Sequence, residues 1–286
     1  MNTVKIMIAG THGFVGTRAL QRYPDAIKVP GELLRNAGEP LTEFIRAHHP
    51  DVILNAAAIS DIGTCENNPD GSFAANVVLP VVMAKAANAI GAKLVSFSSD
   101  QVYTGCDHEG PYKETDDLPT PTNVYARHKL EAEQRVLDIN PDAILLRATM
   151  MYDMPMYGYS DMSTANRGNL WVNILESLLH DKPVKAVAGQ YRGATYVRQV
   201  VNLLDQMFTL PGGVYNYGSE NELPMPETIE KLLETLKVHG QLEVIDEKDA
   251  RHHNLWMDCG KLRENGVFFD TTVEGFARCA KDYGLL

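Results

Sequence analysis

The 286-residue chain lacks several features that would each indicate a particular class of protein. Its four cysteines, Cys65, Cys106, Cys259 and Cys279, form no Cys-x-x-Cys pair, so reduced thiols are expected rather than disulfides or a thiolate metal site. No stretch reaches the roughly 18 uninterrupted apolar residues that a membrane-spanning helix needs. The N-terminus has no basic region ahead of its first apolar run, and hence no secretory signal. These absences predict a cytoplasmic protein with no membrane partner.

Basic residues are also few, with 26 Lys and Arg against 37 Asp and Glu and a formal net charge of -11. A charge of this sign disfavours nucleic acid and anionic membranes as partners. It does not exclude a small anionic ligand, because such a ligand needs only a local pocket of amides or basic side chains. The 44% hydrophobic content is typical of a soluble globular protein. The length suits one large domain or two modest ones.

Short apolar runs and helical segments alternate through the first half of the chain. The runs cover residues 4–10, 50–58, 92–99 and 142–149, and their Val, Ile and Leu suit strands buried on both faces. The helical segments cover 14–22, 40–48, 70–90 and 123–139. This alternation predicts right-handed crossovers and a parallel sheet. The predicted fold class is therefore α/β, a Rossmann-type doubly wound parallel sheet.

The regular alternation ends after residue 149. Residues 150–169 show no period and are predicted to form a long loop, of a kind that often binds ligands or acts as a lid. Beyond it we expect helices near 169–180, 197–208, 226–239 and 272–282, and strands at 184–188 and 214–217. The predicted organisation is a first domain at 1–149, completed by later segments near 184–217, and a smaller mixed lobe at 150–286.

Three glycines, Gly10, Gly13 and Gly16, follow the first strand with the spacing G-x-x-G-x-x-G and open a helix. This context is typical of a dinucleotide-binding loop. The first glycine permits a tight turn, the second lets the backbone approach a pyrophosphate, and the third lets helix and strand pack closely. Amides at the helix start near Phe14 would hold the diphosphate. The first domain is therefore predicted to bind a dinucleotide, with a plain glycine-rich turn as the alternative.

The choice between NAD and NADP depends on the second strand, within DAIKVPGELL. A site selective for NAD usually presents Asp or Glu to the ribose roughly 20 residues after the loop. Asp25 precedes this strand and Glu32 follows a Pro-Gly turn, so neither lies at its end. Arg18 and Arg35 could serve a 2′-phosphate. NADP is slightly favoured over NAD.

A hydroxyl, a phenol and an ammonium follow in chain order. Ser99 ends the fourth strand in SFSSDQVYTG, and Tyr125 and Lys129 lie one helical turn apart on the next helix. Ligands of open parallel sheets lie beyond the carboxyl ends of the strands. The set suits carbonyl reduction, in which Tyr125 donates a proton and the Lys129 ammonium lowers the pKa of that phenol. A solvated pair and a strand-end turn are the alternatives, and Ser98 is a second candidate for the hydroxyl.

Several segments resemble the extended short-chain dehydrogenases, and within them the dTDP-4-dehydrorhamnose reductase family. They are GTHGFVG (10–16), LNAAAISDIGTCENNPDGSFAANV (54–77), SFSSDQVYTG (96–105), PTNVYARHKLEAE (121–133) and RHHNLWMDCGKL (251–262). The resemblance covers nearly the whole chain. It implies that Ser99, Tyr125 and Lys129 catalyse the reduction of a 4-keto-6-deoxy sugar on a nucleoside diphosphate, with NADPH or NADH. It also implies that the C-terminal lobe holds the sugar nucleotide.

The loop and the resemblance together give a set of expected ligand contacts. Cofactor contacts are expected from Gly10, His12, Gly13, Phe14, Val15, Gly16, Asn55, Ala56, Ala57, Ala58, Asn76, Ser98, Tyr125 and Lys129. Substrate contacts are expected from Asp100, Val102, Tyr103, Met150, Arg192 and Arg251. Surface charge is the alternative for Arg192 and Arg251. No metal is expected, and a homodimer is one candidate for the assembly.

The chain departs from the family at the substrate pocket. Where the family usually has tryptophan in R-x-S-W-x-Y, this sequence has Met150, which can fill the volume without an aromatic face. A keto sugar other than dehydrorhamnose is therefore expected. The alternatives are an NAD(P)-binding regulatory subunit of the same fold and a sugar-nucleotide epimerase or dehydratase; the intact trio favours the reductase. Glu131 and Glu133 are interpreted as solvated acids.

Overall fold

The computed structural model describes residues 4–154, 170–246 and 254–286. The chain divides into two compact units. The first comprises Met1–Cys106, Asp117–Ala148 and Val201–Tyr215, and the second Asp107–Asp116, Thr149–Val200 and Asn216–Leu286. The expectations for Arg251 and for residues 155–169 fall outside the described residues.

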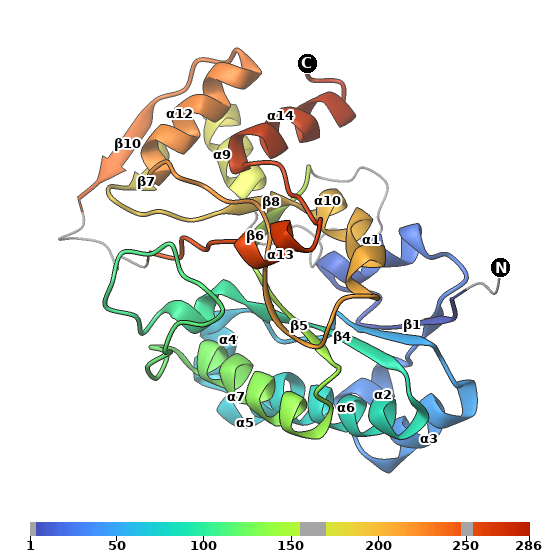
Figure 1. Cartoon of the computed structure of the whole chain (residues 1–286). Coiled ribbons are helices and arrows are strands. Elements are labelled where there is room, and N and C mark those ends of the chain that lie inside the picture. Colours follow the sequence, from blue (N-terminus) through green and yellow to red (C-terminus); the bar gives the residue numbers. More distant parts are fainter. Residues whose placement is uncertain (1–3, 155–169, 247–253) are drawn as a thin grey trace. The chain divides into compact units, whose positions relative to one another are not determined.

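A six-stranded sheet with the strand order β2-β1-β3-β4-β5-β9 forms the centre of the first unit, except that the last two residues of β9, Asn216 and Tyr217, belong to the second unit. Its strands are β1 (Ile6–Ala9), β2 (Ile27–Lys28), β3 (Val52–Asn55), β4 (Lys93–Ser99), β5 (Ile144–Ala148) and β9 (Gly213–Tyr217). The pairs β1–β2, β1–β3, β3–β4 and β4–β5 are all parallel. Figure 1 shows the strands fanning into the usual twist. The predicted α/β class with a parallel Rossmann-type sheet is confirmed.

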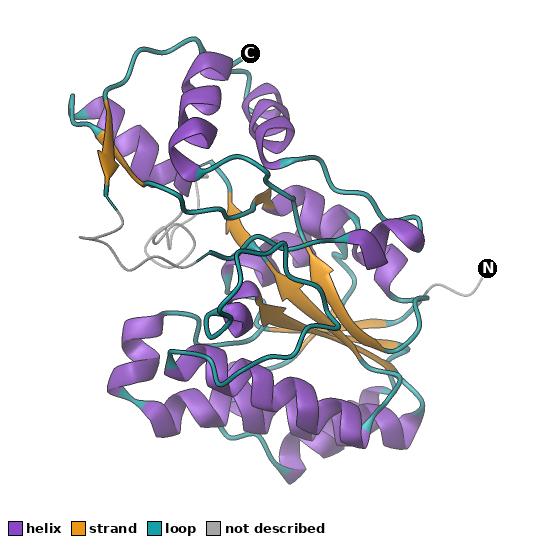
Figure 2. Cartoon of the chain, turned by 60° about the vertical axis from the view of Figure 1, so that its left-hand side comes forward, coloured by secondary structure: helices purple, strands orange, loops and turns teal. Residues whose placement is uncertain are grey.

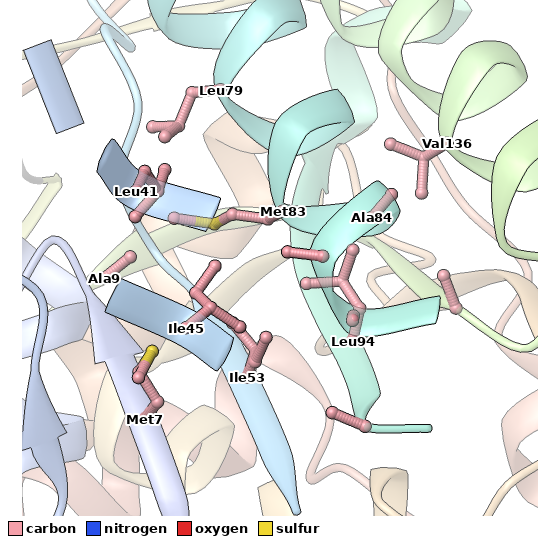
Figure 3. Packing of buried hydrophobic residues seen from close by; sticks show 14 of the residues in the cluster. Met7, Ala9, Leu41, Ile45, Ile53, Leu79, Met83, Ala84, Leu94 and Val136 are labelled. Carbon is pink, nitrogen blue, oxygen red and sulfur yellow. The ribbon is translucent and has the colours of Figure 1, made fainter. Parts of the chain in front are cut away.

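Helices cover both faces of this sheet (Figures 1 and 2). On one face α3 (Glu39–His48), α6 (Leu79–Ile90) and α7 (Val124–Ile139) pack on the strands. Figure 3 shows Leu41, Ile45 and Met83 from two of these helices interdigitating with Met7 and Ile53 of the sheet. On the opposite face α1 (Phe14–Arg22) lies beside α11 (Leu204–Met207), because Arg22 and Tyr23 both bind the Asp205 carboxylate. The later segment 201–215 thereby completes the first unit.

The helix limits follow local signals in the sequence. Asn123 caps α7 by accepting a hydrogen bond from the Ala126 amide, and the helix stops before Asn140-Pro141. The stretch expected as one helix over 70–90 consists of α5 (Pro69–Phe73), the π-turn η1 (Ala74–Val78) and α6. The short helices α2 (Gly31–Arg35) and α4 (Ile62–Asn67) and the 3₁₀ turn η2 (Asp100–Tyr103) were not predicted, because segments of four to six residues are too short to show a period.

The continuous helical stretch Pro69–Ile90 is long and apolar enough to cross a membrane, by length and composition alone. Its mean hydropathy reaches 1.6 over the most apolar window. Several of its apolar side chains, including Met83, Ala84 and Ala87, are completely buried against the sheet. Packing in the core of the first unit therefore accounts for the apolar composition.

The second unit contains two small parallel pairs of strands. β6 (Met150–Tyr152) pairs with β8 (Ala194–Tyr196), and β7 (Val184–Val187) pairs with β10 (Leu242–Ile245). Its helices are α9 (Leu170–Leu179), α10 (Val197–Asn202), α12 (Met225–Leu236), α13 (Gly260–Glu264) and α14 (Thr272–Asp282), with the last two residues of α10 belonging to the first unit. The prediction of a loop at 150–169 is wrong for residues 150–152, because these residues form β6. Tyr152, Tyr196 and Phe276 are buried in the core of this unit.

Candidate functional site

The glycine loop joins β1 to α1, as the spacing predicted. Gly10 has φ +83, and a Cβ there would lie 2.6 Å from the Ala57 nitrogen. A Cβ at Gly16 would lie 2.0 Å from the Gly10 carbonyl oxygen. The packing of the chain itself therefore requires these two glycines.

Gly13 differs from its two neighbours in the loop. Its Cβ would meet only the Gly10 carbonyl oxygen, at 3.3 Å, and its φ of -82 suits any residue. It is exposed and forms the N-cap of α1 without a side chain to cap the helix. The first amides of a helix have no acceptor within that helix. Open space beside helix amides that have no acceptor within the helix suits an anion such as a pyrophosphate, which is the group that this loop was predicted to hold.

Two asparagines fix the backbone that follows β3. Asn55 donates to the Ser96 hydroxyl at 3.0 Å and accepts from the Ala57 amide at 3.2 Å. Asn76, in the π-turn η1, accepts from the Ile59 amide at 3.2 Å and donates to the Ile59 carbonyl at 2.9 Å. Segment 56–58 is therefore held at both ends. It contacts Gly10 closely, so the expected cofactor residues of the loop and of the β3 end lie together.

The hydroxyls of Ser98 and Ser99 leave opposite faces of β4, as successive residues in a strand do. Ser99 accepts from the Gln101 amide at 3.2 Å and donates to the Asp100 carboxylate at 3.1 Å, so it also starts the turn η2. Ser98 donates to Glu133 Oε1 at 2.5 Å. This bond engages the Ser98 hydroxyl in the interior, whereas Ser99 lies at the carboxyl end of the strand. Of the two candidates, Ser99 has the better placement for the reacting hydroxyl.

Tyr125 and Lys129 lie on the first turns of α7, where the helix is anchored from outside. The Glu66 carboxylate of α4 accepts from the Val124 amide at 2.7 Å. The Lys129 ammonium lies 5.7 Å from the centre of the Tyr125 ring and donates to the Phe97 carbonyl of β4 at 2.9 Å. Only 5% of Lys129 and 7% of Tyr125 is exposed. The two residues therefore form a buried pair beside β4 rather than a solvated one.

Burial lowers the pKa of Lys129 from its usual 10.5 to about 8, although Glu133 and Cys65 act in the opposite direction. A buried ammonium is costly unless it is paired. Perturbed groups of this kind gather at functional sites. The ammonium is still mostly protonated at neutral pH, so it can favour the phenolate form of Tyr125 when that residue gives up its proton.

Glu133 corrects an expectation, since it is not a solvated acid. Only 3% of it is exposed, and Arg147 of β5 donates to both carboxylate oxygens at 2.7 to 3.2 Å. Arg147 also donates to the Tyr103 hydroxyl at 2.9 Å. Glu131, by contrast, forms a partly exposed ion pair with Arg135. The missed signal was Arg147 itself, because an arginine inside an otherwise apolar strand needs a buried partner.

The residues expected to contact substrate are placed less uniformly. Asp100, Val102 and Tyr103 all lie in η2 and are at most 1% exposed. In the second unit Met150 is partly exposed, packs against the core of that unit and pairs with Ala194 across β6 and β8. Arg192 is partly exposed and forms a backbone bridge to Leu255. These assignments stay predictions.

One aromatic feature of the second unit was not predicted. The rings of Tyr191 and Trp256 are stacked, with centres 5.6 Å apart and planes 23° apart. Both are partly exposed and come from neighbouring segments, since the Leu255 amide donates to the Tyr191 carbonyl at 3.0 Å. The sequence could not indicate the pair, because 65 residues separate its members and neither segment has a period.

Within the described part of the chain, no three His, Cys, Asp or Glu side chains are grouped as metal ligands would be. The four cysteines are free thiols, and Cys65, Cys259 and Cys279 are buried. His252 and His253 lie outside the described residues. The loop, the two asparagines and the Ser99, Tyr125 and Lys129 group stay the predicted site of the first unit.

A parallel sheet, a glycine loop that leads into α1, and a Ser-Tyr-Lys set at the end of β4 define a Rossmann-type fold of the short-chain dehydrogenase class. The family model described as the RmlD substrate binding domain matches residues 4–263. The chain belongs to this family, which confirms the resemblance seen in the sequence.

Three known proteins illustrate the similarity. The dTDP-4-dehydrorhamnose reductase of Mycolicibacterium smegmatis is 34% identical over 165 residues, 57% of this chain and 46% of that protein. The methionine adenosyltransferase 2 subunit beta of Xenopus tropicalis is 27% identical over 235 residues, 78% of this chain and 67% of that protein. The crystal structure of a Bacillus anthracis dTDP-4-dehydrorhamnose reductase in complex with NADP has a TM-score of 0.84 at 21% identity, covering 99% of both chains. The match to the first reductase spans less than half of its length.

Proposed function

We propose that this protein is an NAD(P)-dependent oxidoreductase that reduces a keto group on a nucleoside-diphosphate sugar. The observation that carries the proposal is the buried Lys129 ammonium, held by the Phe97 carbonyl beside the Tyr125 ring at the end of β4. A buried lysine adds little to a fold and costs stability. Its position is explained if it serves a phenol that must release a proton.

In this reaction Tyr125, Ser99 and Lys129 would each have a separate role. Tyr125 donates its proton to the oxygen of the keto group as that oxygen gains negative charge. Ser99 positions the same oxygen by a hydrogen bond. Lys129 keeps the pKa of Tyr125 low enough for the proton to move near neutral pH. The bound nicotinamide supplies the hydride.

The dinucleotide fits the loop, because Gly13 leaves space beside the first amides of α1. We favour NADP over NAD. Arg18 is 3% exposed and donates to the Phe14 carbonyl, so it is engaged within α1. Arg35 is exposed, and its guanidinium lies beside Gly31 at the start of α2, just beyond the short strand β2. A cation there suits a 2′-phosphate on the adenosine ribose. Tighter binding of NADH than of NADPH would contradict this choice.

The name of the M. smegmatis relative, a dTDP-4-dehydrorhamnose reductase, supports a nucleotide-bound keto sugar as the substrate. Met150 and Arg192 remain proposed substrate contacts. Because a thioether replaces the expected indole at Met150, we propose that the preferred sugar differs from dehydrorhamnose. Cytoplasmic location, the lack of a membrane partner and a homodimeric assembly also remain predictions.

The direct test is a panel of dTDP-, UDP- and GDP-linked keto sugars, with oxidation of NADPH and NADH as the readout. Turnover of at least one keto sugar, greatly reduced in Tyr125→Phe, is the expected result. Met150→Trp should raise kcat/KM for dTDP-4-dehydrorhamnose relative to the other sugars. If wild-type kcat/KM for dTDP-4-dehydrorhamnose already reaches about 10⁴ M⁻¹s⁻¹, the idea of an altered sugar preference is wrong.

A regulatory subunit is the second candidate, favoured by the similarity to methionine adenosyltransferase 2 subunit beta over 78% of this chain. The Ser99, Tyr125 and Lys129 set argues against it, since a pure binding protein needs no proton donor. Dinucleotide binding without turnover of any sugar nucleotide in the panel would favour this candidate.

A further inference from the structure

Four buried side chains form a continuous polar network next to the Ser99, Tyr125 and Lys129 group. Arg147 donates through Nε and Nη2 to the Glu133 carboxylate and through Nη1 to the Tyr103 hydroxyl. Ser98 donates to the same carboxylate at 2.5 Å. All four residues are at most 7% exposed. We call Ser98, Tyr103, Glu133 and Arg147 the buried network.

Stability alone does not explain this network. A buried ion pair is often no more stabilising than apolar residues of the same volume, because both charges lose their hydration. Position along the chain offers a better explanation. Ser98 immediately precedes Ser99, and the turn that ends at Tyr103 begins directly after Ser99. Arg147 pairs with Ser98 across β4 and β5. The network therefore connects the strand that carries the hydroxyl to the helix that carries the phenol.

Glu133 is also the carboxylate next to the Lys129 ammonium. It follows Lys129 by one turn on α7, so both side chains leave the same face of the helix. Both line a small cavity beside β4, together with Ser96, Ser98 and Asn76. The charge of Lys129 thus faces a carboxylate whose own charge is balanced by Arg147.

We propose that Glu133 is a positioning residue of the reductase site, and that the Glu133–Arg147 pair sets the electrostatic potential at Lys129 and Tyr125. This inference rests on the proposed function. A carboxylate close to an ammonium favours the protonated form, so Glu133 opposes the effect of burial on Lys129. Arg147 limits this effect, because its positive charge is in direct contact with the carboxylate. The opposing effects of Glu133 and Arg147 keep Lys129 protonated at neutral pH, with a pKa only slightly above neutral.

Other charged or titratable groups surround this part of α7. Cys65 and Glu66 come from α4, Asp100 and Tyr103 from η2, and His128 from α7 itself, where it shares a hydrogen bond with Ser72 of α5. Of these, Cys65 also favours the charged form of Lys129. Substitutions at Glu133 and Arg147 leave all except Tyr103 with their present contacts, so changes in the titration can be assigned to the pair.

The test compares Glu133→Gln, Arg147→Met and the double variant. In the wild type kcat/KM should fall above about pH 8, where Lys129 loses its proton. Glu133→Gln removes the carboxylate and leaves the Arg147 cation buried. The alkaline fall of kcat/KM, here called the basic limb of the pH profile, should therefore move to a pH about one unit lower. Arg147→Met removes the cation, so the limb should move up by a similar amount. The double variant removes both charges, and its limb should lie close to that of the wild type.

Two further measurements separate this inference from the proposed function. The tyrosinate absorbance of Tyr125, taken as the difference between each protein and the same protein with Tyr125→Phe, should shift in the same directions without any substrate. It therefore reports on the network even if no sugar nucleotide is turned over. Tyr103→Phe keeps every charge, so it should lower stability and leave the titration where the wild type has it.

Opposite shifts in the two single variants, with recovery in the double variant, would establish the electrostatic role. If one single variant does not fold, the direction of the shift in the other single variant decides, with the double variant as its reference. A double variant whose tyrosinate titration differs from that of the wild type by more than about one pH unit would overturn the proposal. Unchanged titration in both single variants would overturn it as well, and would leave the network with a structural role alone.

Discussion

The two units of the chain use their buried polar residues differently. In the described part of the first unit the buried polar residues include five that can carry charge: Arg18, Asp100, Lys129, Glu133 and Arg147. In that of the second unit they are neutral except for Asp153, which accepts hydrogen bonds from the Tyr283 hydroxyl and the Met154 amide. Buried charge is expensive, and it collects where chemistry requires it. The comparison therefore supports the proposal that the reacting groups lie in the first unit.

Neutral side chains in the second unit serve to join distant segments. The Asn216 amide donates to the Tyr112 carbonyl at 2.8 Å and to the Asp258 carbonyl at 2.9 Å. One side chain thus connects segment 107–116 to the C-terminal part of the chain. Thr195 likewise accepts from the Ser219 amide at 2.7 Å and binds the Thr149 hydroxyl. These bonds hold a unit that is assembled from three separate stretches of sequence.

The largest effect is expected from Tyr125→Phe. Removing a positioned proton donor should lower turnover by about 10²–10⁴ while dinucleotide affinity stays nearly the same. Steady-state kinetics on the preferred keto sugar and titration with NADPH measure the two quantities. Wild-type turnover in this variant would show that the proton donor does not lie on α7. The difference in buried charge between the units would then no longer indicate the reacting groups.

Arg147→Met compared with Asn216→Ala tests the difference in buried charge directly. The first leaves Glu133 without its cation and should lower the free energy of unfolding by about 3–5 kcal/mol. The second removes the donor to the Asp258 carbonyl, while the Tyr112 carbonyl still accepts from the Asp258 amide, and it should cost about 1–3 kcal/mol. Urea unfolding of both variants gives the values, and equal losses would mean that the charged network is no more critical than the neutral one.

Lys129→Met should make the protein more stable, although inactive. The folded-state pKa of Lys129, about 8, lies below its usual 10.5, so the unfolded chain holds this proton more tightly. The cost of burial is therefore fully present below about pH 8 and fades as pH rises toward 10.5. We expect a gain of about 1–3 kcal/mol at pH 7 that shrinks at alkaline pH. A loss of stability at neutral pH would show that the ammonium is structural.

Gly13→Ala should have the smallest effect on stability. A Cβ at this position meets only one atom, at 3.3 Å, so the free energy of unfolding should change by less than about 1 kcal/mol. Affinity for NADP(H), measured by calorimetry, should fall about tenfold or more, because the methyl group occupies the space of the pyrophosphate. Gly16→Ala is the matched control, since its Cβ meets backbone at 2.0 Å and should damage folding first. Unaltered affinity in Gly13→Ala would exclude this loop as the pyrophosphate site.

The sequence predicted the parts of the fold that have a period and a stop signal. Helices α1 and α14 begin and end where they were expected, and α14 has a capping box between Thr271 and Glu274. β6 and β10 were missed, because segments of three and four residues in a mixed lobe look like loop. Their pairing depends on strands 44 and 58 residues away, which no local pattern encodes.

The sequence predicted which residues form the candidate site, but not their burial or their hydrogen-bond partners. Chain order placed Ser99, Tyr125 and Lys129 together, because the carboxyl end of a strand and the following helix meet in a parallel sheet. Chain order could not show that Glu133 is buried, since its partner Arg147 lies on a different strand. Nor could it distinguish Ser98 from Ser99, because a shift of one residue in the strand exchanges the two faces.

The π-turn η1 changes the direction in which side chains leave the helix axis partway along the stretch Pro69–Ile90. One inserted residue turns all later side chains by about 100° relative to a regular α-helix. Ser72 and Asn76 can then bind each other, His128 and Ile59, while Met83 and Ala87 still face the sheet. Deletion of that one residue would leave the helix intact but force a choice between the apolar core and the backbone beside the dinucleotide loop. The inserted residue therefore lets one end of the helical stretch bind the backbone beside the glycine loop while the other end packs on the apolar core. A regular α-helix could not direct its side chains to both at once.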